Sequence, residues 1–312
     1  MERERAVAIG QCISILILMS LGTVLTKMSL GNVEPLTFVG VSVLIGMIAM
    51  SIYTFIIRGE RIPRGLPPSV WYYMIAIGVG NFAIVRVLNT VSLDLMPAST
   101  NTFLTNFVGF VTMGMSIFLL KESPTPFQIL GAIIAVIGIR VFFPTLPSPD
   151  EMTGIILVGL SILALGYTNN IARKLAVETR GEVSNNVIST VALLVGGSIA
   201  VVICFALEWP PRITTGTDWM NAFYAGLVMI ALGLTLWNHI LRTLRSYEAS
   251  ILGASTVIWT TLLAIPMLGE HVTSYQVAGM GLLVVGLATV QIRSNISLGS
   301  LLGRKASRST EV

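Results

Sequence analysis

The sequence is poor in charged residues. Only 11% of its 312 residues are Asp, Glu, Lys or Arg, whereas soluble domains carry about 25%. Hydrophobic residues make up 54% of the chain, and its mean hydropathy is +0.83. A soluble protein of this length could not bury so much apolar surface. The composition therefore excludes an ordinary soluble protein and indicates that lipid surrounds most of the chain.

Residue types that ligate metals or perform catalysis are also scarce. The chain has two cysteines and two histidines, and Cys12 and Cys204 lie inside apolar runs, far from any Cys/His cluster. This arrangement predicts neither a disulfide framework nor a zinc site. The sequence also has no phosphate-binding loop and no nucleophile–base motif. We therefore expect that the protein is not an enzyme and that it uses no cofactor and no metal.

Long apolar segments dominate what the sequence does contain. Each is about 18–25 residues long and can cross roughly 30 Å of hydrocarbon as a helix. The ten segments lie near residues 7–29, 35–57, 70–92, 98–119, 126–143, 154–176, 185–207, 219–243, 248–268 and 274–292. The sequence therefore predicts an all-α integral membrane protein with ten transmembrane helices.

The basic residues are distributed unevenly between the loops. If the N-terminus is placed in the cytoplasm, fifteen Lys and Arg residues fall on the cytoplasmic side and three, Lys27, Arg140 and Arg212, on the other. The positive-inside rule then predicts that both termini are cytoplasmic and that the chain spans the cytoplasmic (inner or plasma) membrane. The net charge of the chain is only +4. Its basic residues are dispersed along the sequence, and this pattern does not predict nucleic-acid binding.

One stretch of sequence occurs twice. Residues 118–138 (FLLKESPTPFQILGAIIAVIG) resemble residues 266–286 (PMLGEHVTSYQVAGMGLLVVG) when shifted by 148 positions. The matching pairs are Leu120/Leu268, Glu122/Glu270, Thr125/Thr273, Gln128/Gln276, Gly131/Gly279, Val136/Val284 and Gly138/Gly286. Five predicted spans separate the copies, and an odd number reverses the direction of the chain. The sequence therefore predicts two inverted five-helix repeats.

The repeat sets the predicted domain boundaries. The first repeat covers residues 1–146 and the second covers residues 147–293, with no long linker between them. Residues 294–312 form a basic, serine-rich tail, which we expect to be disordered and cytoplasmic.

A family resemblance follows from these same residues. Residues 248–290 carry an Ala-Ser pair, an apolar run, an L-x-E motif, a glutamine and a helix with glycines seven apart. This pattern resembles the EamA-like transporters of the drug/metabolite transporter superfamily, over nearly the whole chain. The resemblance implies a transporter whose cavity is built mainly from spans one, three, four, six, eight and nine. Family members often carry a proline early in spans four and nine, where this chain reads TNFVGF and STVIWTT; the departure predicts an unusual cavity lining.

Arg86 is the sharpest candidate for a functional residue. It lies inside the third predicted span, and no Asp or Glu lies deep in any span. A guanidinium without an ionic partner favours an anionic group on a substrate, such as a carboxylate or phosphate. The alternative is a structural arginine that reaches the membrane surface or binds backbone carbonyls and water.

Other polar and aromatic residues inside spans complete the predicted substrate-binding set. Amides and hydroxyls in an apolar helix favour a cavity, although hydrogen bonds between helices would also explain them. Aromatic rings could cover an apolar part of the solute. The set consists of Arg86, Asn89, Asn101, Thr105, Asn106, Tyr167, Asn170, Trp237, Asn238, His239 and Trp259.

Three smaller features bear on mechanism. His239 is the only residue well inside a span with a near-neutral pKa, so any histidine-based proton coupling would have to use it; passive facilitation or exchange is favoured. Glu122 and Glu270 are predicted on opposite sides of the membrane, each stabilising the start of the next helix. Small residues spaced i, i+4, such as Gly131 and Ala135, favour close packing, either internal or in a homodimer.

These observations predict a secondary transporter that moves small organic solutes by alternating access. Amino acids or related metabolites, exported or exchanged, are the expected substrates, and the lipid bilayer is the expected surrounding. Efflux of amphiphilic drugs or toxic compounds, or exchange of phosphorylated or nucleotide-type metabolites, remain the alternatives.

Overall fold

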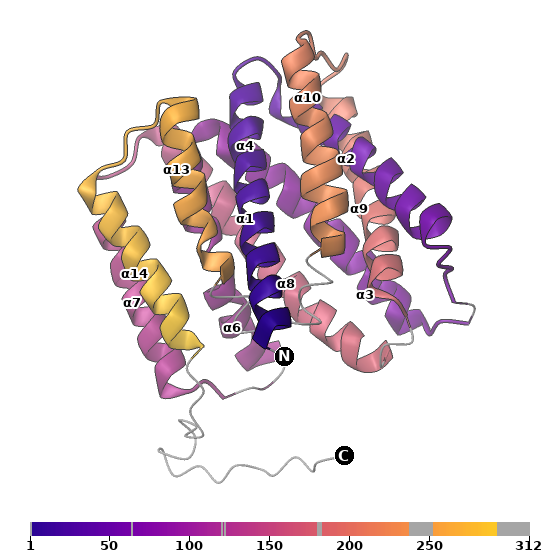
Figure 1. The fold of residues 1–312 in the computed structure, drawn as a ribbon, viewed down its shortest axis with the longest axis horizontal. Coiled ribbons are helices and arrows are strands. Elements are labelled where there is room, and N and C mark those ends of the chain that lie inside the picture. Colours follow the sequence, from indigo (N-terminus) through magenta and orange to yellow (C-terminus); the bar gives the residue numbers. More distant parts are fainter. Residues whose placement is uncertain are drawn as a thin grey trace.

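The structure is a computed structural model that describes residues 2–63, 65–119, 121, 123–179, 183–236 and 252–291. This part of the chain is helical and contains no strand, and its helices stand side by side in one bundle (Figure 1). The elements are α1 (Glu2–Leu30), α2 (Pro35–Ser51), η1 (Ile52–Ile57), α3 (Pro68–Gly78), η2 (Val79–Val85), α4 (Arg86–Leu95), α5 (Ala98–Thr105), α6 (Val108–Leu119), α7 (Pro126–Phe142), α8 (Pro149–Thr179), α9 (Asn185–Leu207), α10 (Gly216–Tyr224), η3 (Ala225–Leu232), α13 (Thr256–Leu268) and α14 (Ser274–Val290).

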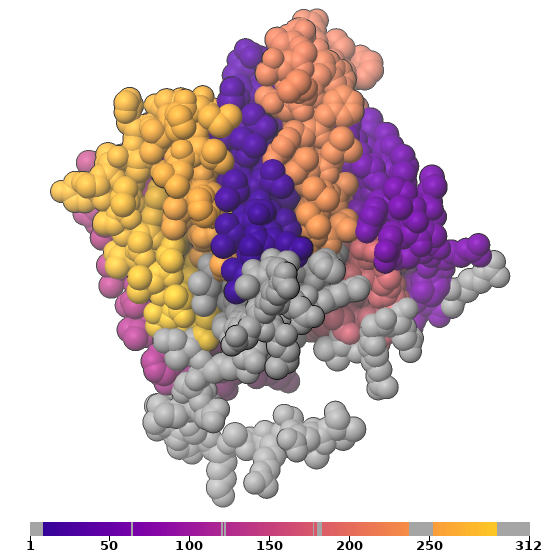
Figure 2. Space-filling view, viewed as in Figure 1, coloured from indigo at the N-terminus to yellow at the C-terminus, as the bar shows by residue number. Residues whose placement is uncertain are grey.

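The helices have the length and composition that a membrane requires. Seven helical segments of the described chain are long and apolar enough to cross it, and three further apolar helices, 126–142, 252–268 and 274–290, are shorter. A helix of 17 residues spans about 26 Å at 1.5 Å per residue. The predicted multi-pass helical membrane architecture is therefore confirmed. Figure 2 shows α14, α13, α1, α10 and α2 forming one face.

The outer surface of the bundle is apolar. Large side chains such as Ile56, Phe118 and Val202 are exposed at 74%, 83% and 68% of their surface. In water such a surface would promote association, whereas in a bilayer it contacts lipid at no cost. The exposure pattern therefore agrees with a chain that is embedded in lipid.

The two copies of the repeated sequence begin with the same capping structure. At the start of α7, the Thr125 hydroxyl accepts from the Gln128 N–H at 3.3 Å, and the Gln128 side chain accepts from the Thr125 N–H at 2.8 Å. At the start of α14, Thr273 and Gln276 form the same pair at 3.3 and 2.8 Å. Each pair is a capping box that satisfies two N–H groups of a helix start. The repeated threonine and glutamine are therefore explained by helix initiation.

The repeated glycines meet each other where α7 packs against α14. A Cβ atom on Gly131 would lie 2.5 Å from the carbonyl oxygen of Gly286, and one on Gly286 would lie 2.7 Å from that of Gly131. Gly138 and Gly279 form a second such pair, with corresponding distances of 3.1 and 2.9 Å. Only glycine allows the backbones to approach this closely. The Gly131–Ala135 spacing thus serves an internal interface, because Ala135 also lies against Gly286.

Several of the remaining helix contacts occur in matching pairs: such a contact has a counterpart in which the helices of the first and second halves are exchanged. Helix α1 packs on α13, and correspondingly α8 packs on α6. Helix α2 packs on η3, and correspondingly α9 packs on α3 and η2. Helices α2 and α9 pack on each other. The same pairing rule therefore holds in both halves, as expected for a repeated architecture.

Candidate functional site

Three cavities follow one another through the interior of the bundle. The large cavity, of about 670 Å³, is lined by residues of α1, α6, α7, α8, α13 and α14. The central cavity, of about 220 Å³, shares Asn106, Val108 and Thr256 with it. The Arg86 cavity, of about 40 Å³, shares Thr23 and Asn89 with the central cavity. Shared lining residues make these cavities one row that leads from the large cavity to Arg86.

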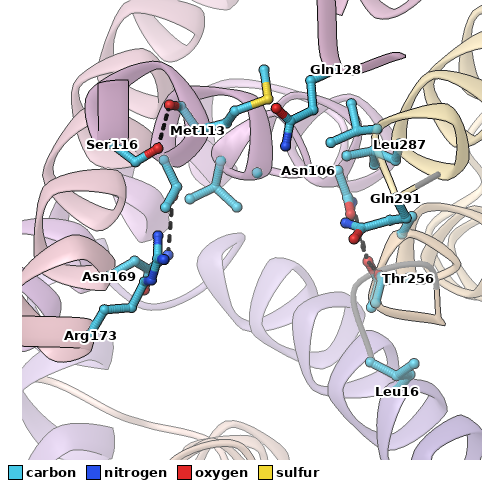
Figure 3. A pocket seen from close by; sticks show the side chains of 16 residues that line it. Leu16, Asn106, Met113, Ser116, Gln128, Asn169, Arg173, Thr256, Leu287 and Gln291 are labelled. Carbon is cyan, nitrogen blue, oxygen red and sulfur yellow. Dashed lines mark hydrogen bonds between the residues drawn. The ribbon is translucent and has the colours of Figure 1, made fainter. Parts of the chain in front are cut away.

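The large cavity has a polar wall. Figure 3 shows Asn169 and Arg173 on one side of the space, with Gln128 and Gln291 on the other. The Asn169 amide donates to the Thr112 hydroxyl at 3.4 Å, which ties α8 to α6. Amide and guanidinium groups on opposing helices can bind a polar solute from two sides.

The central cavity lies between two broken helices. The helix of residues 98–119 is interrupted at Asn106 and Phe107, between α5 and α6, and the helix of residues 252–268 is interrupted at Ser255. The Asn106 amide donates to the Thr256 hydroxyl across this gap at 3.2 Å. The two interruptions are related by nearly the same 148-residue shift as the repeat. One residue from each half of the chain therefore joins the two breaks directly.

Polar side chains predicted from the sequence gather around the central cavity. Asn89, Asn101, Thr105 and Asn106 all line it. The Asn89 amide donates to the Thr105 hydroxyl at 3.2 Å, and the Asn101 amide donates to the Ser92 hydroxyl at 3.0 Å. These bonds hold the side chains in place at the wall, as interhelical hydrogen bonds do in membranes. The structure thus brings four of the predicted residues together.

Arg86 lies in the smallest cavity, at the point where the π-helical segment η2 gives way to α4. A π-helical turn redirects the side chains that follow it, and such turns are frequent at functional sites. The Arg86 cavity is lined by the polar residues Thr23, Thr26, Ser42, Asn89 and Thr90, together with Phe38, Leu93 and Met229. Within the described part of the chain, Arg86 forms no hydrogen bond or ion pair.

A second polar group in the row of cavities also has no partner. Thr260 lines the central cavity and is only 1% exposed, and its hydroxyl oxygen has no hydrogen-bond partner among the described residues. A buried hydroxyl without a partner is costly. Thr260 and Arg86 therefore offer the central and Arg86 cavities two groups that a solute could satisfy.

The structure places three other predicted residues away from these cavities. Tyr167 is 41% exposed. The Asn170 amide donates to the backbone oxygens of Thr112 and Gly166 at 3.1 and 2.9 Å, and so joins α8 to α6. The Trp259 ring packs against α1, and its N–H donates to the Ser255 hydroxyl at 3.1 Å. Asn170 and Trp259 thus have the geometry of packing residues, whereas Tyr167 lies at the surface. Trp237, Asn238 and His239 lie outside the described residues.

The sequence reasoning named no individual residue of the first helix, although the family resemblance implied that the first span lines the cavity. Ser20 and Thr23 of α1 line the central cavity, and Thr23 and Thr26 line the Arg86 cavity. Their spacing of three residues places them on one face of a helix, and this is the signal that could have identified them. The Thr26 hydroxyl donates to the Gly22 backbone oxygen of its own helix at 2.8 Å. A hydroxyl bonded in this way costs little free energy in a membrane, so its presence in a span does not by itself indicate a cavity.

Carboxylates bind helix starts in the other half of the chain. Glu208, directly after α9, accepts from the Leu36 and Thr37 N–H groups of α2 at 3.2 and 2.6 Å. Glu270, after α13, accepts from the Ala98 N–H of α5 at 2.5 Å. The expectation that Glu270 stabilises the next helix is therefore wrong, because Thr273 caps α14 and Glu270 turns back to the first half. Glu122 lies outside the described residues.

The described residues contain no group of three or more His, Cys, Asp and Glu side chains that could hold a metal ion. Cys12 and Cys204 are both buried free thiols.

Comparisons with known proteins give one family and one fold. A family model described as the EamA-like transporter family matches residues 7–143 and again residues 152–291. No curated protein matches the chain. Among solved structures, 28 chains match. One, titled only "Crystal structure of protein", is 19% identical, with a TM-score of 0.65 over 91% of this chain and 96% of that chain. At this identity the likeness concerns the fold alone.

Proposed function

The chain belongs to the EamA-like transporter family, a family of membrane transporters, and from this premise we propose that it is a secondary transporter of small organic solutes. It works by alternating access, in which two halves of similar fold rock around a site between them. Amino acids or related metabolites are the substrates, and the transport is export or exchange across the cytoplasmic membrane.

The proposed architecture has ten transmembrane helices in two inverted halves, residues 1–146 and 147–293. The family match in two copies supports this division. So do the two capping boxes, the reciprocal glycine contacts of α7 and α14, and the matching breaks at residues 106 and 255. The Asn106–Thr256 hydrogen bond then lies close to the axis that relates the halves.

Arg86 carries the proposal for the substrate. Its guanidinium lines an internal cavity and has no bonding partner among the described residues. Burying an unpaired charge is expensive, so such a residue inside a membrane span is kept for a ligand or an ion pathway. A carboxylate matches the planar fork of a guanidinium with two parallel hydrogen bonds. We therefore assign Arg86 to an anionic group of the solute.

The rest of the solute occupies the central cavity. Asn89 and Thr105 line it beside Asn106, and the Thr260 hydroxyl supplies a group that lacks a protein partner. Its volume of about 220 Å³ is below the ~300–1,000 Å³ of sites that take drug-sized ligands. The size and polarity of this cavity favour a small polar metabolite over a bulky amphiphilic drug.

Ligand-induced thermal stabilisation tests this assignment. Purified protein in detergent is screened with amino acids, carboxylates, phosphorylated metabolites and lipophilic cations, and every hit is repeated on Arg86→Gln. A ligand at a hundredfold excess over its Kd stabilises the folded state by about 2.7 kcal/mol. Arg140→Gln is the matched control, because Arg140 is an exposed residue that binds the backbone oxygens of Phe143 and Pro144.

The expected result is that anionic or zwitterionic solutes stabilise the wild type and Arg140→Gln but not Arg86→Gln. If only lipophilic cations stabilise the protein, and Arg86→Gln responds to them equally, the anion site is wrong and drug efflux replaces it. If phosphorylated metabolites stabilise more strongly than carboxylates, the phosphorylated-substrate alternative is supported instead.

A further inference from the structure

Glu270 joins the two halves of the protein at one end of the bundle. Its carboxylate accepts from the Ala98 N–H at 2.5 Å, from the Ser99 N–H at 3.2 Å and from the Ser99 hydroxyl at 2.5 Å. Ala98 and Ser99 begin α5 in the first half, whereas Glu270 follows α13 in the second. A carboxylate at a helix N-terminus binds unpaired N–H groups and the positive end of the dipole. We call these three residues the Glu270 latch.

The latch is surrounded by further charge. Lys27 of α1 donates to the backbone oxygen of Asp94 at 2.7 Å. Lys27, Asp94 and Glu270 together line a cavity of about 670 Å³ at this end of the bundle. The Lys27 hydrogen bond therefore joins α1 to α4, beside the latch that joins α5 to the end of α13.

The latch lies at one end of the helices that line the central cavity. Helices α5 and α13, which it joins, pack on each other and both line the central cavity. Thr26 of α1 lines the Arg86 cavity, and the next residue is Lys27. The large cavity lies toward the opposite ends of the helices, where Ser116 lies in the last turn of α6, Gln128 lies in the first turn of α7 and Gln291 follows α14. The latch thus lies beyond the central cavity along both α5 and α13, at the ends of these helices that face Glu270.

We propose that the Glu270 latch is the gate on this face: bonded, as in this structure, it closes the face, and it must open before a solute can pass. This inference rests on the proposed transport function, to which it adds the device that controls access. Opening requires α5 to part from the end of α13. A few hydrogen bonds to one ionised carboxylate suit this task, because they are strong when made and are replaced by water when broken.

Glu208 provides a matched comparison. Its carboxylate also accepts two N–H bonds at a helix start in the other half. However, it joins α9 to α2, which pack on each other, and neither helix contributes a residue to the central cavity. Glu208→Gln therefore changes the same chemistry at a contact that the proposal treats as static.

The experiment measures access to Thr105→Cys, which lies in the central cavity, by a membrane-impermeant maleimide added to the face that carries Glu270. The full-length chain is used with Cys12 and Cys204, both buried, replaced by alanine. Glu270→Gln removes the charge and turns one acceptor into a donor that faces N–H groups. Loss of even one charge-assisted hydrogen bond should raise the labelling rate roughly tenfold. Glu208→Gln should leave the rate nearly unchanged.

The proposal is overturned if Glu270→Gln is folded but labels at the wild-type rate, or if Glu208→Gln accelerates labelling as much. Ser99→Ala is the second variant, since it removes only the hydroxyl bond to Glu270 and leaves the carboxylate in place. Ser99→Ala should raise the labelling rate by a smaller factor than Glu270→Gln. If Glu270→Gln does not fold, Ser99→Ala replaces it as the test, and an unchanged labelling rate then rejects the gate. Because no solute is present, the result is independent of the Arg86 ligand test.

Discussion

Single carboxylates hold the halves of this protein together, and Glu60 shows how such a contact depends on pH. Glu60 follows η1 in the first half, and its carboxylate accepts from the Ser184 hydroxyl and from the Asn186 amide, the latter at 2.8 Å, at the start of α9. Arg58 lies 3.6 Å away. Burial acts to raise the pKa of the Glu60 carboxyl, but the hydrogen bonds and Arg58 outweigh it, so its pKa is below the ordinary 4.5.

A carboxyl whose pKa is lowered by folding stabilises the folded state only while it is ionised. Its contribution is therefore complete above about pH 4.5 and is lost as the pH falls through the lowered pKa. We expect Glu60→Gln to cost roughly 1 kcal/mol at pH 7. The difference between variant and wild type should shrink below pH 4.5. Thermal unfolding in detergent from pH 7 to pH 3 measures this, with the exposed Asp150→Asn as control; a constant difference would contradict it.

Several residues that line the central cavity could be singled out from the sequence because burying a polar group in a membrane span is expensive. Asn89, Asn101, Thr105 and Asn106 stood out as amides and hydroxyls in apolar segments, and the structure gathers them at one cavity. Periodicity could not tell which face of a helix meets a cavity, so Tyr167 and Trp259 were grouped with them although one is exposed and the other packs on α1. The hydrogen bonds of Glu270 to Ala98 and Ser99 in the other half depend on tertiary contacts, which a local sequence pattern cannot show.

Among the helix contacts, the contact of α7 with α14 restricts the sequence most, because it requires glycine at several positions. A Cβ atom on Gly286 would meet the Gly131 carbonyl oxygen at 2.7 Å, and backbone cannot move aside without separating the helices. We expect Gly286→Ala to cost about 1–3 kcal/mol, the usual range for overpacking. Gly281→Ala on the same helix is the control, because a Cβ there meets nothing within 4 Å. It should stabilise the helix by about 0.5–1 kcal/mol.

The free energy of unfolding of both glycine variants can be compared by thermal or denaturant titration in the same detergent. Equal effects of the two substitutions would show that α7 and α14 do not pack as closely as described, and the explanation of the repeated glycines would fail.

Helix positions were largely predictable, whereas interruptions within helices were not. The expected spans at 98–119 and 185–207 coincide with the observed segments Ala98–Leu119 and Asn185–Leu207. The break at Asn106 and Phe107 carries no proline or glycine to announce it. Its Phe107 N–H instead bonds to the Leu104 oxygen at 2.9 Å, and Asn106 bonds across to Thr256. Tertiary contacts of this kind, like the π-helical segments, lie beyond what hydrophobic periodicity can show.

At the scale of the whole molecule, the repeat was the most informative feature of the sequence. It paired Thr125 with Thr273, Gln128 with Gln276 and the glycines of the two copies, and the structure shows that these residues form matching capping boxes and reciprocal glycine contacts between α7 and α14. The relation between the halves at the central cavity depends on packing among distant helices, so the row of three cavities emerged only from the structure.

The orientation of the whole chain in the membrane is the remaining prediction. Basic residues divide fifteen to three between the two sides, which places the loop around Arg61 in the cytoplasm and the loop around Leu146 outside. Leu146 is 91% exposed, and the native cysteines Cys12 and Cys204 are 0% exposed, so background labelling is low. In intact cells, an impermeant maleimide should label Leu146→Cys at once and Arg61→Cys only after permeabilisation. The reverse pattern would invert the orientation, and labelling of both would mean that the chain inserts in two directions. Either result would also move the Glu270 gate, because Ser148 and Glu151, next to Leu146 in sequence, line the same cavity as Glu270.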